Sequence, residues 1–286
     1  MEPWLRDLVE DLFGVAMKAQ RPVSGGCIAS AYQVVLSDGR HYFVKSTDDC
    51  TEMFRKEANG LSELAQAEGL RVPGVIWADN TFLVMEWLES NTRLPYFMEL
   101  LGQGLAKVHR RQADAFGLDE DNFIGATPQI NTPQRAGQTW PEFYWEHRMA
   151  FQLQLAEKNG YATPELRSLM SLLENKLEAI LSGSEEPPSL IHGDLWSGNV
   201  LSDEKGEPCI FDPAVYYGHR EAELGMTHLF GGFSEAFYRA YHEAYPLQEG
   251  HEYRRGVYKL YHVLNHLNLF GRSYYGQAIE ILRQYQ

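Results

Sequence analysis

The alternation of apolar and polar residues divides the chain into a strand-rich first part and a helical second part. In the first part, strands are predicted over residues 31–36 and 41–45, joined by a hairpin turn at 37–40. One helix is predicted over 51–69, where apolar residues recur at helical spacing, and a strong apolar strand over 81–88. The beginning of the chain is therefore predicted to form a small β-rich lobe.

From Tyr96 onward the pattern is mainly helical. Apolar residues recur at helical spacing in the segments 97–110, 141–159, 164–181, 234–245 and 253–270. Short apolar runs at 190–191 and 209–211 are each followed by polar residues, which indicates small strands that present loops. The segment 116–140 is rich in Gly, Pro, Asn and Thr and is predicted to be a long loop, which is usually a functional or mobile feature.

Together these elements predict an α+β chain with two lobes. The β-rich N-terminal lobe is expected over residues 1–88 and the helical C-terminal lobe over residues 89–286, with the connector at about 86–93. The length of 286 residues and the 44% of hydrophobic residues are sufficient for a sizeable core without disulfide bonds.

Charge and cysteine usage exclude several classes of protein. The net charge of −14 argues against a nucleic-acid partner, which requires a basic face. The sequence has three scattered cysteines (Cys27, Cys50 and Cys209) and no CxxC pair, which suits a reducing compartment and excludes a zinc ribbon. No run approaches the roughly 18 apolar residues of a membrane helix, and the charged N-terminus is no signal peptide. We expect a cytoplasmic protein without membrane contact.

The strongest candidate for chemistry lies between the helical segments. Residues 190–201 have the sequence LIHGDLWSGNVL, and residues 210–214 follow with IFDPA. Phosphoryl transfer from ATP requires a carboxylate beside the acceptor hydroxyl and hard oxygen ligands that hold Mg²⁺ against the triphosphate. Asp194 fits the first role, and Asn199 and Asp212 fit the second.

The pattern HGDxxxxN followed by a strand and an Asp resembles the catalytic and metal-binding loops of the protein-kinase-like fold. The residues HGD and DPA, in place of HRD and DFG, are typical of its small-molecule branch. The resemblance implies an Mg²⁺·ATP site between the two lobes. Lys45 then resembles the strand lysine that contacts the ATP phosphates, and Glu57 resembles its carboxylate partner.

Further nucleotide contacts are expected on either side of this lysine. Gly25 and Gly26, within SGGCIAS at 24–30, stand where a phosphate-covering loop is expected, although the full GxGxxG pattern is missing. Met85, Glu86 and Leu88 lie on the strand that enters the connector, where backbone groups of Glu86 and Leu88 are expected to meet the adenine.

The Trp-Ser pair within HGDLWSGN makes the chain similar to the fructosamine/ketosamine kinase family. Three other stretches resemble the same family: Phe116-Gly117 with Asn122 and the TPQ of 127–129, the WPEFY of 140–144 with Arg148, and residues 212–221 continuing to FGGF at 230–233. The resemblance implies an ATP-dependent kinase that phosphorylates the sugar 3-hydroxyl of ketoamines, either small molecules or glycated lysine and protein. The phosphorylated product decomposes and regenerates the amine, so the implied role is deglycation repair.

Several residues carry two interpretations. Trp196 packs on the sugar or the cationic amine of the acceptor, or supports the loop as a core aromatic. His266 lines the acceptor pocket or only packs its helix, and a metal site with His262 is disfavoured because no HExxH pattern is present. Glu221 binds substrate or locks the loop. Cys27 is a redox-sensitive thiol whose oxidation disturbs ATP binding or links a homodimer, or it is inert in a monomer.

Three other functions compete with this hypothesis. A kinase of another small amine or sugar, such as an aminoglycoside or choline, would share the ATP machinery and differ only in its acceptor. A nucleotide-binding pseudoenzyme is disfavoured because every expected catalytic position is filled. A protein kinase is disfavoured because no long activation segment or APE motif follows Asp212.

Overall fold

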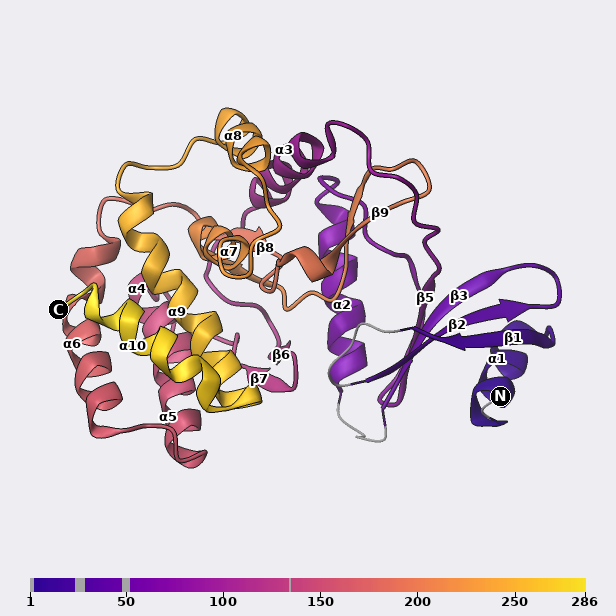
Figure 1. Cartoon of the computed structure of the whole chain (residues 1–286), viewed down its shortest axis with the longest axis horizontal. Helices are drawn as coiled ribbons and strands as arrows, with labels where there is room; N and C mark the ends of the chain where they lie inside the picture. Colours follow the sequence, from indigo (N-terminus) through magenta and orange to yellow (C-terminus); the bar gives the residue numbers. More distant parts are fainter. Residues whose placement is uncertain (1–2, 24–28, 48–51, 134) are drawn as a thin grey trace.

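The computed structural model describes residues 3–23, 29–47, 52–133 and 135–286, which form a small lobe built on a sheet and a larger helical lobe (Figure 1). The α+β two-lobed architecture predicted from the sequence is confirmed. Among these described residues, no helix is long and apolar enough to cross a membrane.

The small lobe contains a five-stranded antiparallel sheet. Its strand order is β1-β2-β3-β5-β4, and the strands are β1 (Met17–Pro22), β2 (Ser30–Leu36), β3 (His41–Ser46), β4 (Val75–Ala78) and β5 (Phe82–Glu86). Helix α1 (Pro3–Phe13) and helix α2 (Met53–Gln66) pack with residues of this sheet.

Strand β5 shows why its sequence is apolar at consecutive positions. Val84 packs into the cluster that contains residues of α1, whereas Leu83 and Met85 pack into the cluster that contains Phe54 of α2. Because successive strand residues point to opposite faces, a strand covered on both faces is apolar throughout. The same covering makes β5 a rigid approach to the connector between the lobes.

The large lobe is built from helices around a shared apolar core, in which α9 contacts α5, α7 and α10. Its helices are α3 (Phe97–His109), α4 (Trp140–Tyr144), α5 (Ala150–Lys158), α6 (Pro164–Leu181), α7 (Arg220–Thr227), α8 (Glu235–Ala244), α9 (His251–Phe270) and α10 (Tyr275–Arg283). In Figure 1 the long gold helix α9 runs across the lobe beside α7 and α10.

Three short antiparallel strand pairs in this lobe present the loops that the sequence singled out, and two of them, β9–β10 and β6–β7, are hairpins. β8 (Ser189–Ile191) pairs with β11 (Tyr216–Gly218), β9 (Val200–Ser202) with β10 (Pro208–Ile210), and β6 (Asn122–Ile124) with β7 (Thr127–Gln129). A 3-10 turn (Ser197–Asn199) ends the loop after β8. The segment 116–140 is therefore not loop throughout, because it contains the β6–β7 hairpin.

The structure corrects the single helix predicted over 141–159. A π-helical turn (Trp145–Met149) separates α4 from α5, and the backbone N–H of Ala150 donates to the carbonyl of Trp145. The wider turn accommodates Arg148, whose buried guanidinium donates to the carbonyl of Ile130 and to Asn131 Oδ1, each at 2.6 Å, and stacks on Tyr216. The π turn thus lies where a buried guanidinium finds the hydrogen-bond partners that its burial requires.

Helix α7 was not predicted, for a physical reason. All eight of its residues are buried, including Arg220, Glu221 and Glu223. In so short a helix, where three charged residues are buried, the apolar positions do not mark the buried surface, and a helical pattern is hard to recognise. Strand β1, which begins at Met17, and helix α10 were missed as well, and the strand predicted over 81–88 ends at Glu86.

Candidate active site

A lysine and two carboxylates meet where the two lobes face each other. Lys45 lies on β3, opposite Leu83 of β5, and its Nζ is 2.7 Å from Glu57 Oε1 and 2.5 Å from Asp212 Oδ1. Burial by itself lowers the pKa of Lys45, but the carboxylates of Glu57 and Asp212 outweigh it and raise that pKa. Lys45 is therefore a cation that two carboxylates hold in place.

Asn199 connects this cluster to Asp194. Its Nδ2 donates to the backbone carbonyl of Asp194 at 2.8 Å and lies 3.5 Å from both Asp194 Oδ2 and the carbonyl of Asp212. Burial, followed by the charges of Glu223 and Asp212, raises the pKa of Asp194 well above its ordinary value. The structure thus brings together Lys45, Glu57, Asp194, Asn199 and Asp212.

The donor set fits a cation that arrives with a phosphate ligand. Asn199 and Asp212 offer hard amide and carboxylate oxygens, which Mg²⁺ prefers. Across the described parts of the chain, no group of three or more His, Cys, Asp or Glu could hold a metal ion. Mg²⁺ commonly uses one or two carboxylates and completes its shell with water and substrate phosphates, so two protein ligands suit it.

Glycine is required inside the HGD motif. Gly193 has φ +83°, and a Cβ at this position would lie 2.0 Å from the carbonyl oxygen of Ala214. The loop after β8 therefore passes against the segment that follows Asp212, closer than any side chain allows. His192 supports the same contact, because its Nε2 donates to the carbonyl of Phe211 at 2.9 Å while its Nδ1 accepts the N–H of Asp194 at 3.3 Å.

Glu223 on α7 is a loop-holding residue that sequence analysis missed. Its buried carboxylate accepts the backbone N–H groups of His192 and Gly193, the latter at 3.2 Å. His109 Nε2 lies 3.9 Å from the same carboxylate. Burial alone raises the pKa of Glu223, but the hydrogen bonds and charges of these neighbours outweigh it and lower that pKa. A fixed anion therefore holds the loop that carries Asp194.

A set of buried amides holds the other loop, after Asp212. Asn122 Nδ2 donates to the carbonyl of Val215 at 2.7 Å, and Gln129 Nε2 donates to the carbonyl of Ala214 at 3.0 Å. Asn122 also accepts from Gln129 and Asn131. The sequence offered a signal for this network, since Asn122 and Gln129 belong to stretches that resemble the kinase family.

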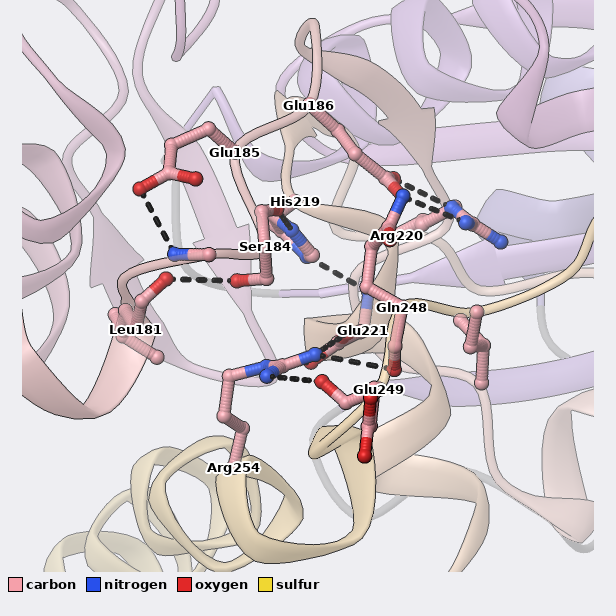
Figure 2. Close-up of polar contacts among 12 residues, drawn as sticks. Leu181, Ser184, Glu185, Glu186, His219, Arg220, Glu221, Gln248, Glu249 and Arg254 are labelled. Atoms are coloured by element: carbon pink, nitrogen blue, oxygen red, sulfur yellow. Dashed lines mark hydrogen bonds and ion pairs between the residues drawn. The ribbon is translucent and has the colours of Figure 1, made fainter.

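Glu221 forms a buried ion pair that supports α7. Figure 2 shows the guanidinium of Arg254, on α9, directed at Glu221, with Nε 2.8 Å and Nη2 2.7 Å from its two carboxylate oxygens. The N–H of Glu221 donates to Nδ1 of His219, which caps the N-terminus of the helix. Of the two interpretations given to Glu221, these contacts favour the one in which it locks the structure.

The end of β5, where the chain enters the connector, forms an ion pair with an arginine that sequence analysis did not identify. Arg71 Nη2 is 2.6 Å from Glu86 Oε1, and Arg71 Nη1 is 2.8 Å from Asp203 Oδ2 and 2.6 Å from Glu204 Oε2. Arg71 thereby ties the end of β5 to the turn between β9 and β10. Met85 is buried in the small lobe, and Leu88 lies half-buried in the connector.

Helix α2 is docked on the large lobe through one face, which we name the α2 clasp. Lys56 Nζ and Asn59 Nδ2 reach Glu120 at 2.6 and 2.8 Å, and Glu63 lies 3.4 Å from Arg111 and 3.3 Å from the Tyr217 hydroxyl. Between these pairs, Gly60 allows the helix to approach the side chains of Pro213 and Val215. The clasp therefore fixes the helix that carries Glu57 against the segment that follows Asp212.

Trp196 and His266 are brought to one aromatic surface. The Trp196 ring meets the ring of Phe230 edge-on, with centroids 6.0 Å apart, and Phe230 lies 4.9 Å from the His266 ring. Trp196 is 38% exposed, so it is no core aromatic. Phe230 was missed as a site residue, although it begins the FGGF stretch. Gly25, Gly26 and Cys27 lie outside the described residues.

Structural comparison places this fold among small-molecule phosphotransferases. A putative fructosamine-3-kinase from Thermobifida fusca superimposes with a TM-score of 0.88 at 36% identity, covering 98% of both chains. A thermostable mutant of the aminoglycoside phosphotransferase APH(4)-Ia, in ternary complex with AMP-PNP and hygromycin B, gives a TM-score of 0.69 at 17% identity, covering 98% of this chain and 96% of the other. The second likeness shows the fold alone, which is the protein-kinase-like fold.

Sequence comparison gives the family. The family model for fructosamine kinase matches residues 4–286. A probable ketoamine kinase of Synechocystis is 40% identical over 273 residues, 94% of this chain and 90% of the other. A chloroplastic protein-ribulosamine 3-kinase of Arabidopsis thaliana is 40% identical over 273 residues, 92% of this chain and 81% of the other. The chain belongs to the fructosamine kinase family, which confirms the resemblance seen in HGDLWSGN.

Proposed function

We propose that this protein transfers the γ-phosphoryl group of ATP to the 3-hydroxyl of a ketoamine. The observation that carries the proposal is the convergence of Lys45, Glu57, Asp194, Asn199 and Asp212 in one site of a chain that belongs to the fructosamine kinase family. These groups are the fixed cation, oxygen ligands and carboxylate that phosphoryl transfer requires.

The nucleotide is proposed to lie between the lobes, which we divide at residues 88 and 89. Lys45, held by Glu57, contacts the phosphates, and backbone groups of Glu86 and Leu88 face the adenine beside Met85. Gly25 and Gly26 are proposed, from their place in the sequence, to cover the phosphates. Asn199 and Asp212 supply oxygens to Mg²⁺, which neutralises charge on the triphosphate when it is bound.

Asp194 is proposed to orient the acceptor hydroxyl and to take its proton. As the bond forms between the sugar oxygen and the γ-phosphorus, the bond from that phosphorus to the β,γ-bridging oxygen breaks and ADP leaves. The raised pKa of Asp194 supports this role, because a more basic carboxylate accepts a proton more readily. Glu223 keeps the loop in place without contacting the reacting atoms.

The acceptor is proposed to be a ketoamine formed on lysine or on protein, and a ribulosamine is the first candidate. The support is the relatives named protein-ribulosamine 3-kinase, together with the aromatic groups beside Asp194. A ketoamine nitrogen is cationic near neutral pH and suits the face of Trp196. Burial lowers the pKa of His266, so its ring is neutral and does not repel that cation. Decomposition of the product would restore the amine.

An acceptor panel tests the proposal. ADP release is measured with Mg²⁺·ATP and ribulosyl-lysine, fructosyl-lysine, hygromycin B or choline, using wild type, Asp194→Asn and Asp212→Asn. We expect turnover with at least one ketoamine, loss of more than about a thousandfold in both variants, and unchanged melting temperatures. Turnover of hygromycin B or choline alone would assign the protein to another branch of the fold. Activity in the folded Asp194→Asn variant would refute the role of this residue.

We further propose that Cys27 is redox-sensitive. The proposal is based on its position in the sequence, directly after Gly25 and Gly26 and before the strand that carries Lys45. The reducing cytoplasm would keep the thiol free and the protein monomeric, and oxidation would link two chains. Non-reducing gel electrophoresis after peroxide treatment compares wild type with Cys27→Ser. A dimer band confined to wild type supports the proposal, and identical monomer bands contradict it.

A further inference from the structure

An aromatic row extends from the catalytic loop to the end of α9. Beyond Trp196 and Phe230, the ring of His266 lies 5.4 Å from that of Phe270 and 5.1 Å from that of Tyr274. We name these five side chains the aromatic platform.

Three apolar members of the aromatic platform, Trp196, Phe230 and Phe270, are open to solvent, whereas His266 and Tyr274 are half-buried. Phe230 is 41% exposed and Phe270 is 49% exposed, comparable to Trp196. Single exposed aromatic residues are common, but a contiguous exposed cluster marks a binding surface. Here the cluster begins two residues after Asp194, so it continues the candidate active site.

Local backbone geometry holds the aromatic platform in place. His266 Nδ1 donates to the carbonyl of His262 at 2.7 Å, which fixes the ring at the centre of the row. Gly271 ends α9 with φ +91°, and the short 3-10 turn (Arg272–Tyr274) after it brings Tyr274 back to His266. Such fixed rings provide contact area at little cost in conformational entropy.

We propose that the aromatic platform binds an apolar peptide segment attached to the ketoamine nitrogen. This inference rests on the proposed function, because it uses the position of the acceptor hydroxyl at Asp194. In a ketoamine, the nitrogen lies only two carbons beyond the reacting C3, so the group it carries must leave the pocket close to Trp196. The surface that begins there presents the rings of Trp196, Phe230 and Phe270 to solvent, and Arg272 in the adjoining turn donates to the carbonyl of Gly160 at 3.3 Å. This surface therefore fits apolar flanking residues.

Two glycated peptides and one small acceptor test the inference. Both peptides carry a central ribulosyl-lysine, flanked by Leu and Phe in one and by Ser and Gly in the other; the small acceptor is N-methyl ribulosamine. The variants are Phe270→Ser and Tyr274→Ser. Tyr253→Ser is the control, because Tyr253 is 56% exposed on the same helix but about 25 Å away along its axis.

We expect wild type to favour the Leu/Phe peptide by about tenfold in kcat/KM, mainly through KM, as expected for stacked aromatic contacts. Phe270→Ser and Tyr274→Ser should remove most of this preference, whereas Tyr253→Ser should retain it. The kcat/KM for N-methyl ribulosamine should differ by no more than about twofold among the four proteins.

Equal kcat/KM of wild type for the two peptides would overturn the inference. So would a loss in Phe270→Ser that is as large for N-methyl ribulosamine as for the peptide. If no ketoamine reacts, the proposed function fails separately, and calorimetric binding of the two peptides decides the inference: tighter binding of the Leu/Phe peptide, lost in Phe270→Ser, supports it, and equal binding refutes it.

Discussion

From the α2 clasp we predict that charged residues remote from the nucleotide affect the rate of phosphoryl transfer from ATP. Lys56 and Glu120 face each other at 2.6 Å, and neither touches Lys45 or Asp212. They act through the helix that carries Glu57. We therefore expect Lys56→Glu and Glu120→Lys each to impair phosphoryl transfer, and the double variant with reversed charges to recover it.

The magnitude follows from the exposure of the pair. The side chains are 20% and 30% exposed, so the attraction is worth about 1 kcal/mol, and replacing it by repulsion changes α2 docking by about 2 kcal/mol. That free energy corresponds to about a thirtyfold shift between docked and undocked α2. We expect a loss of about tenfold in kcat/KM for ATP, because the contacts of Gly60 and Glu63 remain in the single variants.

The assay measures kcat and KM for ATP at saturating ketoamine, together with the melting temperature. Arg40→Glu is the matched control, because Arg40 pairs with Asp38 in the small lobe at an exposed hairpin and the change in charge is the same. We expect this control to retain wild-type kinetics and the Lys56→Glu/Glu120→Lys variant to return to within about threefold of wild type. Wild-type kinetics in both single variants, or no recovery in the double variant, would refute the role of the clasp.

Three further results are expected. Gly193→Ala should inactivate the protein and lower its urea midpoint, because the added Cβ would lie 2.0 Å from the carbonyl oxygen of Ala214; a fully active variant would contradict the described loop. Arg71→Gln should raise KM for ATP more than it lowers kcat, since it frees the end of β5; an unchanged KM would contradict this. Burial lowers the pKa of His262 to about 3, whereas its pKa in the unfolded chain is about 6.5. Between these pH values the unfolded chain binds more protons than the folded protein, so the free energy of unfolding decreases as the pH falls below 6.5. At pH 5 this group alone accounts for about 2 kcal/mol, and urea unfolding at pH 7 and 5 should show a smaller acid loss in His262→Asn than in wild type; an equal loss would contradict it.

Part of the site that sequence analysis identified consists of residues that lie close together in the sequence, whereas Lys45 and Glu57 were identified only through the resemblance to the kinase-like fold. Asp194 and Asn199 belong to one loop, and the strand that precedes Asp212 was visible as an apolar run. The α+β order was predictable because β2 and β3 form a hairpin and most helices of the large lobe have one apolar face.

The residues that were missed depend on contacts between distant segments. Glu223 lies on a helix buried on every side, and its importance comes from the N–H groups of His192 and Gly193, thirty positions earlier. Arg71 is surrounded by carboxylates from both lobes, and Phe230 becomes part of a surface only through Trp196 and His266. Neither periodicity nor spacing along the chain records such juxtapositions.

Phosphorus NMR of wild type with Mg²⁺·ATP and ribulosyl-lysine tests the central claim most directly. The account predicts a new sugar-phosphate resonance coupled to the proton on C3, formed together with ADP and absent with a folded Asp194→Asn variant. No sugar phosphate from wild type would contradict the claim, as would an equal rate of formation by Asp194→Asn. A nucleotide-dependent rise in melting temperature without transfer would retain the ATP site and reject the ketoamine acceptor.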